Sequence, residues 1–368
     1  MSSELFREGG PHNIRRVGRD QYQLSVNIPE DSAGLMAREC PDDDCTPGYF
    51  KVRGGTGLTG ESYTVAFCPY CRREAEPNDF YTRQQLEYAK RVAMREAEQG
   101  VERMVKQAFG LGPSGKKTLG KGGFLSIEMS YKPSYHPPVG RPLEEELRRD
   151  LRCPHCGLEH AVFGIAMWCP DCGQDLFLAH VREEFSAIRK MLGEIDSRRE
   201  RLGARVAARD IENALEDIVS IFEAVLKLIT RSVLRAQGKQ DDEITMILDQ
   251  QVRNAFQSVS RGAEKFHVLV GQDLLGALSG VEREELEATF EMRHPITHNL
   301  GVLDRKYLAK VRSGEVEGSE VRVDARHVER ALSFAERTLI HAYGFVPAAP
   351  DTTASDSQEH PGTSDEEG

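Results

Sequence analysis

The sequence predicts an α+β protein in which small β modules precede a larger all-α bundle. Three observations support this class. All eight cysteines fall in closely spaced pairs within the first half of the chain. The segments around these pairs alternate apolar and polar residues with the period of a strand. From His180 onward, apolar residues recur every three or four positions, which is the period of a helix.

The cysteine spacing predicts two metal sites. Four thiolates can hold one Zn²⁺ tetrahedrally, and two-residue spacings are typical of zinc ligands. Disulfides are the alternative, but they form mainly in exported proteins, and the start MSSELFREGG has no apolar signal core. We expect two zinc ribbons whose four-thiolate sites are closed and structural, so that their folding depends on the metal. The ligands are Cys40, Cys45, Cys68 and Cys71 in the first ribbon, and Cys153, Cys156, Cys169 and Cys172 in the second.

The remaining elements of the β region are predicted from the spacing of apolar residues and from Gly- and Pro-rich segments. Strands are expected at 21–28, 49–53 and 63–67, the last two joined as a hairpin by a Gly-rich turn. A long charged helix (80–109), a Gly/Lys loop (110–123), a strand (124–131) and a Pro-rich linker follow. The expected domains are a first ribbon with N-terminal strands (1–79), the helix, loop, strand and linker (80–142), a second ribbon (143–179), a helical bundle (180–345) and a disordered acidic tail (346–368).

The bundle should contain a series of amphipathic helices. The clearest runs from Val206 to Leu234, with an apolar stripe that includes Ile211, Ile218 and Ile229. Further helices are predicted at 243–259, 263–278, 281–292, 298–311 and 324–343, with a break at Pro295.

Two glycine-rich segments look like phosphate loops but lack the required context. Gly55–Gly60 fits G-x-G-x-x-G, yet a strand follows it where a dinucleotide fold needs a helix. Gly110-x4-Gly115-Lys116 lacks the Ser or Thr of a phosphate-binding loop and follows a helix rather than a strand. Lys116, Lys117 and Lys121 form either a solvated loop or a contact to a nucleic-acid backbone.

Composition narrows the partner classes. The formal net charge is −11, which argues against a general nucleic-acid coat, although a local basic contact is still compatible with it. Much of the acidity lies in the 351–368 tail, which has no Lys or Arg. No apolar run has the length of a membrane span, so we expect a soluble, cytoplasmic protein that does not enter membranes.

A short polar string late in the bundle carries the strongest functional signal. Arg293-His294-Pro295-Ile296-Thr297-His298-Asn299 places an arginine five positions before a histidine. A guanidinium holds phosphate with a fork of donors, and an imidazole moves protons near neutral pH. The same spacing occurs at Arg7/His12 and Arg322/His327, so spacing alone does not single out a site. The alternative is that Arg293 is a buried arginine that ties helix ends together and that His298 is a helix N-terminal residue.

The context of this string resembles a family. RHPITHN-x-G-x-x-D-x-x-Y, from Arg293 to Tyr307 in a helical domain, resembles the Arg-x4–6-His signature of HEPN domains. The resemblance covers roughly residues 181–345. It implies a helical bundle, usually a homodimer, and in many members a metal-independent endoribonuclease whose composite site draws on both subunits.

The resemblance implies a function in RNA cleavage, in a toxin, defence or RNA-processing setting, with the ribbons used for targeting. His298 would act as general base or acid, and Arg293 would stabilise charge on the phosphoryl oxygens, leaving a 2′,3′-cyclic phosphate. His294 and Asn299 are candidates for binding the substrate. The alternatives are a non-catalytic module that binds nucleic acid or a protein, and a structural partner of a nucleotidyltransferase-type protein.

Overall fold

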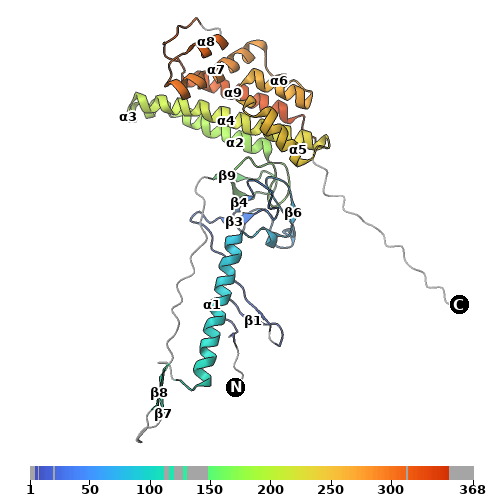
Figure 1. Ribbon diagram of the computed structural model, residues 1–368, viewed down its shortest axis with the longest axis vertical. Coiled ribbons are helices and arrows are strands. Elements are labelled where there is room, and N and C mark those ends of the chain that lie inside the picture. Colours follow the sequence, from blue (N-terminus) through green and yellow to red (C-terminus); the bar gives the residue numbers. More distant parts are fainter. Residues whose placement is uncertain are drawn as a thin grey trace, which may run out of the picture. The chain divides into compact units, whose positions relative to one another are not determined.

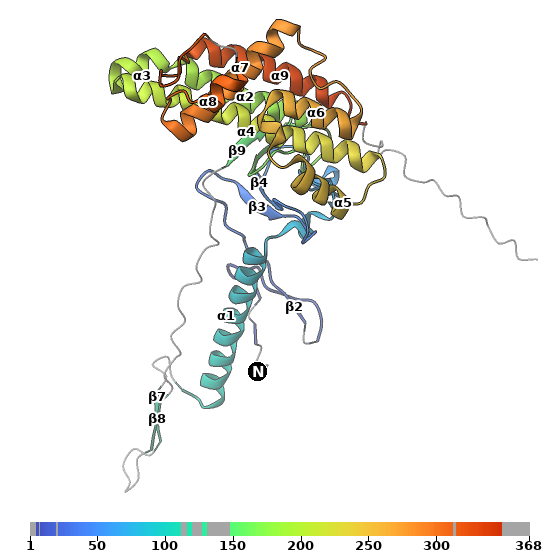
Figure 2. The same cartoon turned by 45° about the horizontal axis from the view of Figure 1, so that its top comes forward.

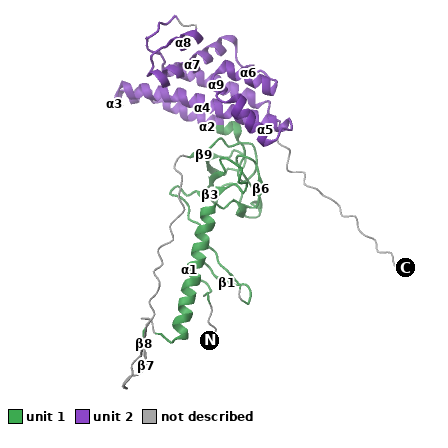
Figure 3. Cartoon of the chain, in the orientation of Figure 1, with its two compact units in different colours: residues 1–180 green, residues 181–368 purple. Residues whose placement is uncertain are grey.

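A computed structural model describes residues 5–6, 8–19, 21–111, 116–119, 127–130, 148–311 and 314–347. The expected acidic tail from 351 and the Pro-rich linker lie outside these residues. The chain forms two compact units, Met1–His180 and Val181–Gly368 (Figure 3). Small antiparallel sheets in the first unit and helices in the second confirm the mixed α+β class. Among the described residues, no helix combines the length and apolar character needed to cross a membrane.

One four-stranded antiparallel sheet joins both cysteine groups in the first unit. Its order is β3-β4-β10-β9, so β4 from the first group pairs with β10 from the second, with Phe50 opposite Val162. The expected hairpin of strands 49–53 and 63–67 is wrong, because β5 pairs with β6 instead of β4. Strands this short are marginal in pairs, and the shared sheet lets them bury a common core. The strands are β3 (Met36–Glu39), β4 (Tyr49–Val52), β5 (Ala66–Phe67), β6 (Glu74–Ala75), β9 (Arg149–Arg152) and β10 (Glu159–Val162).

A long helix and two small strand pairs complete this unit. The helix α1 (Arg83–Ala108) begins with a capping box between Thr82 and Gln85 and ends close to the predicted position. The strands β1 (Arg15–Arg16) and β2 (Tyr22–Gln23) pair near the N-terminus, and β7 (Lys116–Leu119) pairs with β8 (Ile127–Ser130). The predicted Gly/Lys loop therefore contains a strand. Of two 3₁₀ turns, η1 (Gly60–Ser62) lies between β4 and β5, and η2 (Pro77–Phe80) lies between β6 and α1.

The second unit is a helical bundle built around α4 (Figure 1). The predicted helix 206–234 is confirmed as α4 (Ala204–Ala236), and the stripe with Ile211, Ile218 and Ile229 is buried. Phe222 on α4 meets Phe290 on α7 edge-to-face, with ring centroids 5.3 Å apart. The other helices are α2 (Phe177–Gly193), which begins in the first unit, α3 (Ile195–Leu202), α5 (Asp241–Met246), α6 (Val259–Val270), α7 (Gly280–Asn299), α8 (Arg305–Lys310) and α9 (Ala325–Tyr343).

The segment predicted as one helix from 243 to 259 is broken. After α5 comes a π-helical turn, η3 (Ile247–Val252), then Arg253 with φ 49°, and then a 3₁₀ turn, η4 (Ala255–Gln257). Neither glycine nor proline marks this break in the sequence. The turn buries Phe256 completely, and this burial accounts for a break that local propensity does not predict.

The predicted helix break at Pro295 is also wrong. Helix α7 continues through Pro295 to Asn299, although proline removes one backbone donor and costs about 3 kcal/mol inside a helix. Burial of Pro295 and Ile296 against the bundle offsets this cost. The helix ends instead at Leu300 (φ 52°), where the Leu300 and Gly301 amides donate to the Pro295 carbonyl. A second view shows α8 beside α7 (Figure 2).

Candidate functional site

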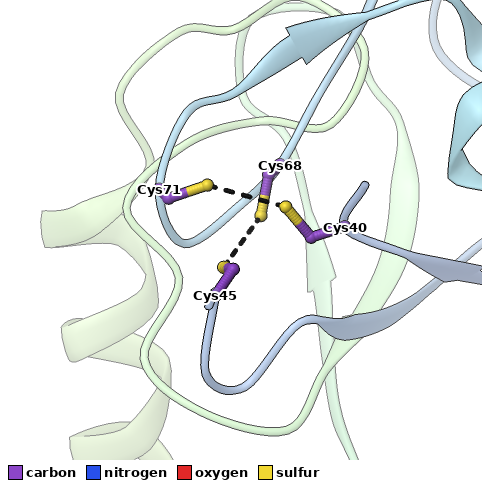
Figure 4. A group of neighbouring side chains, drawn as sticks. All are labelled: Cys40, Cys45, Cys68 and Cys71. Atoms are coloured by element: carbon purple, nitrogen blue, oxygen red, sulfur yellow. Dashed lines mark hydrogen bonds between the residues drawn. The ribbon is translucent and has the colours of Figure 1, made fainter. Parts of the chain in front are cut away.

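The first cysteine group forms a closed cluster of four sulfurs (Figure 4). The Cys40 and Cys71 Sγ atoms are 3.7 Å apart, as are those of Cys45 and Cys68. Four thiolates at about 2.3 Å around one tetrahedral ion would be about 3.8 Å from one another, close to these separations. All four ligand atoms lie within 4.8 Å of one another, so the group can hold a metal ion.

The second group has the same geometry. The Cys153–Cys172 and Cys156–Cys169 sulfur distances are 3.8 and 3.6 Å. A hydrogen bond from Cys169 is the main cause that lowers the pKa of Cys172, to about 5, whereas burial raises the pKa of Cys156 to about 12. No cysteine is in a disulfide, and the eight cysteines form two sets of four, as the sequence predicted.

Tight turns shape three of the four cysteine pairs. The residue after the second cysteine has positive φ in each: Arg72 (63°), Gly157 (80°) and Gly173 (63°). The turn amides then donate back to the first cysteine's carbonyl, as Gly157 does to Cys153. Arg72 takes this backbone shape without being glycine, and its guanidinium lies 4.7 Å from the Trp168 ring centroid.

The Gly55–Gly60 loop is not a phosphate cradle. The Asp171 carboxylate accepts a hydrogen bond from the Leu58 amide at 3.0 Å, and a Cβ on Gly57 would lie 2.2 Å from the same carboxylate. A carboxylate already occupies the space that a phosphate would need. Lys116 of the Gly110-x4-Gly115-Lys116 string begins the strand β7 rather than a helix, which again does not fit a phosphate loop.

The second unit brings the predicted arginine and histidines to one pocket of about 290 Å³. Because α7 is continuous, Arg293 and His298 lie about 140° apart around one helix, with His294 between them. His298 and Asn299 are exposed, whereas Arg293 and His294 are half-buried. The pocket is lined by Phe290, Glu291, Arg293, His294 and His298 from α7, and by Asn254, Gln257, Arg261 and Lys310 from other elements.

Arg293 is held by an amide. Its Nη2 donates to Gln257 Oε1 at 2.8 Å, and Gln257 Nε2 donates to Glu223 Oε2 at 2.7 Å. Glu223 in turn pairs with Lys227 at 2.7 Å. A carboxylate only accepts and a guanidinium only donates, so these partners fix the amide with its oxygen toward Arg293. Arg293 is thereby oriented by a neutral group that leaves its charge available.

Other arginines of the bundle contrast with Arg293. Arg198 forms two hydrogen bonds with Asp210, at 2.6 and 3.2 Å, and Arg283 pairs with Asp273 at 3.1 Å. These carboxylates neutralise the guanidinium, as expected of a structural arginine. The pairing of Arg293 with an amide is more consistent with binding an anion.

The two histidines are neighbours on α7. The His294 and His298 ring centroids lie 4.9 Å apart. Burial lowers the pKa of His294 below its ordinary value, and the nearby charge of His298 lowers it further. Asp304 is 3.9 Å from His294 Nε2. The pocket therefore holds a half-buried imidazole next to a second, exposed one.

Asn299 lies apart from the pocket lining. Its Nδ2 donates to Asp304 Oδ2 at 3.2 Å, and Asp304 Oδ1 caps α8 through the Tyr307 amide at 2.8 Å. Asn299 therefore supports the α7–α8 corner. Arg322/His327, which has the same spacing, is also separate from the pocket. His327 lies in the first turn of α9, and its Nδ1 is 2.8 Å from Asp324 Oδ1.

Four pocket residues had no signal in the motif. Asn254 and Gln257 belong to the unpredicted break before α6, Arg261 lies in the first turn of α6, and Lys310 comes from α8. Lys310 pairs with Glu291 at 2.6 Å. Only long-range packing brings these residues to α7, so no local pattern could have found them.

Comparisons with known proteins identify no relative. No family model, no curated protein and no solved structure matches this chain.

Proposed function

We propose that this protein is a metal-independent endoribonuclease of the HEPN type. The observation that carries the proposal is the pocket on α7, where Arg293, His294 and His298 meet and Arg293 is oriented by an amide rather than neutralised. A cationic pocket with two imidazoles has the groups needed to bind a phosphodiester and to move protons around it.

In this mechanism the ribose 2′-oxygen attacks the adjacent phosphorus, and the bond to the 5′-oxygen of the next nucleotide breaks. One imidazole accepts the proton of the 2′-hydroxyl, and the imidazolium so formed gives a proton, directly or through a water, to the departing 5′-oxygen. His298 acts as general base or acid, and His294 orients the substrate beside it. Arg293 stabilises the charge on the non-bridging oxygens. The products are a 2′,3′-cyclic phosphate and a free 5′-hydroxyl.

Zn²⁺ is the proposed metal of both cysteine groups, because four thiolates at this spacing suit its tetrahedral preference. Each group leaves no ligand position open, so the metals support the ribbons and take no part in cleavage. Elemental analysis should give about two Zn²⁺ per chain. Cleavage should survive brief exposure to EDTA.

A homodimer formed through the bundle is part of the proposal, since the resemblance places Arg and His of two subunits in one composite site. Light scattering at micromolar concentration should then report twice the 41.2 kDa chain mass. A monomer that persists as concentration rises would contradict the dimer.

The decisive experiment compares RNA cleavage by Arg293→Ala and His298→Ala with that of the wild type. Each variant should lose about 10²–10⁴-fold in rate while keeping its melting temperature, because His298 is exposed and Arg293 half-buried. Two matched controls should keep full activity: Arg283→Ala on the same helix, and the double variant Arg322→Ala/His327→Ala with the same spacing. A wild type that binds RNA without cutting it would favour the non-catalytic binding module instead.

A further inference from the structure

The part of the pocket wall that does not come from α7 or α8 is formed by the break before α6 and by the first turn of α6. Asn254, Gln257 and Arg261 line it, and none belongs to the Arg-x4-His string. Gln257 is already engaged by Arg293 and Glu223. Asn254 and Arg261 are exposed and free to meet a ligand.

Arg261 is the cationic residue of this pocket whose guanidinium has no partner among the described residues. Lys310 is paired with Glu291, and Arg293 is held by Gln257. Arg261 also lines the pocket, and within the described residues its guanidinium has neither an ion pair nor a hydrogen bond. An uncommitted guanidinium presents its full fork of donors, which matches the oxygens of a phosphate.

The backbone before Asn254 is strained. Arg253 has φ 49° and ψ −113°, which is costly for a residue with a side chain, on the order of 1–3 kcal/mol. Strain of this kind persists where the surrounding structure requires one conformation. Here the strained residue turns the chain so that Asn254 and Gln257 face the pocket.

We propose that Arg261, assisted by the Asn254 amide, is a second phosphate-binding group for single-stranded RNA. The inference rests on the proposed function and extends it by assigning substrate contacts outside the motif. A volume of about 290 Å³ is near the lower end of ligand pockets, so it holds about one nucleotide unit. Arg261 binds the RNA backbone at this pocket, while Arg293 remains oriented for the phosphate that reacts.

Binding of a labelled single-stranded 2′-O-methyl RNA tests the proposal. This probe keeps the phosphates but has no attacking hydroxyl, so wild-type protein cannot cleave it by the proposed route. Arg261→Ala should weaken binding about tenfold. The slope of log K against log salt should also fall by about 0.7, the value for one phosphate contact on a single strand. With cleavable RNA, Arg261→Ala should raise KM more than it lowers kcat.

Lys265→Ala is the matched control, since Lys265 lies one turn beyond Arg261 on α6, has no ion pair or hydrogen bond from its side chain to a described residue, and does not line the pocket. It should leave both affinity and slope unchanged. Equal weakening by both variants would mean general charge attraction and would overturn the proposal. So would unchanged binding by Arg261→Ala, or no binding by wild type at about 50 mM salt.

The two proposals fail separately. If Arg293 and His298 variants abolish cleavage but Arg261→Ala binds normally, the nuclease stands and the Arg261 subsite is wrong. If wild type cleaves no RNA but Arg261→Ala alone weakens binding, the subsite stands as an RNA-binding site and the nuclease assignment fails.

Discussion

At the residue scale, the buried Asp31 carboxylate pairs with two cationic side chains of the first unit. Asp31 Oδ2 lies 2.9 Å from Lys51 Nζ and 3.0 Å from Arg148 Nη1, and the Lys51 and Asp31 side chains are 1% and 4% exposed. Asp31→Ala would leave Lys51 buried without this partner, so we expect a loss of about 3–5 kcal/mol in the free energy of unfolding. Urea unfolding of the zinc-loaded protein measures it, with the exposed Asp43→Ala as control.

His160 should make stability depend on pH at the same scale. Burial lowers its pKa from 6.5 to about 4, with a further contribution from the charge of His180. Between these values the unfolded chain takes up a proton that folded His160 does not, so stability falls as pH falls below 6.5. From pH 7.5 to 5.5 we expect a loss of about 1.4 kcal/mol, which His160→Gln should lack. Equal pH slopes for both proteins, with zinc content unchanged, would contradict this.

At the scale of elements, three segments cooperate to aim one side chain. Helix α4 provides Glu223 and Lys227, the turn η4 provides Gln257, and α7 provides Arg293. Gln257→Leu keeps the volume but removes the acceptor, so Arg293 loses its orientation. We expect RNA cleavage to fall on the order of tenfold, with the fold retained. Gln250→Leu, an exposed glutamine of η3, is the control and should keep wild-type rates. Equal rates for both variants would mean that Gln257 does not position Arg293.

At the scale of the whole molecule, the two units should respond differently to metal removal. Both cysteine groups lie in the first unit, where Cys40, Cys68, Cys153 and Cys169 belong to its buried core. The second unit contains no cysteine. Removing the proposed zinc with a strong chelator should expose the first unit to protease, while most helical circular dichroism remains. Loss of the whole helical signal would show that the bundle depends on the ribbons.

The sequence by itself determined the features that depend on local spacing. The two sets of four cysteines, the helices α1, α4 and α9, and the mixed α+β class follow from ligand spacing and period, which act over a few residues. Arg293, His294 and His298 were likewise found from one short string and do share a pocket.

Only the tertiary structure decided which distant segments meet. In the tertiary structure β4 pairs with β10 in one sheet, α7 continues through Pro295, and the helical conformation is interrupted at Arg253. The same packing places Gln257, Arg261 and Lys310 at the pocket. In each case burial outweighs a local preference: Ile296 beside a helical proline, Phe256 after a strained turn, and Phe50 within a sheet of four-residue strands. Burial depends on residues far apart in the chain, so no local pattern records it.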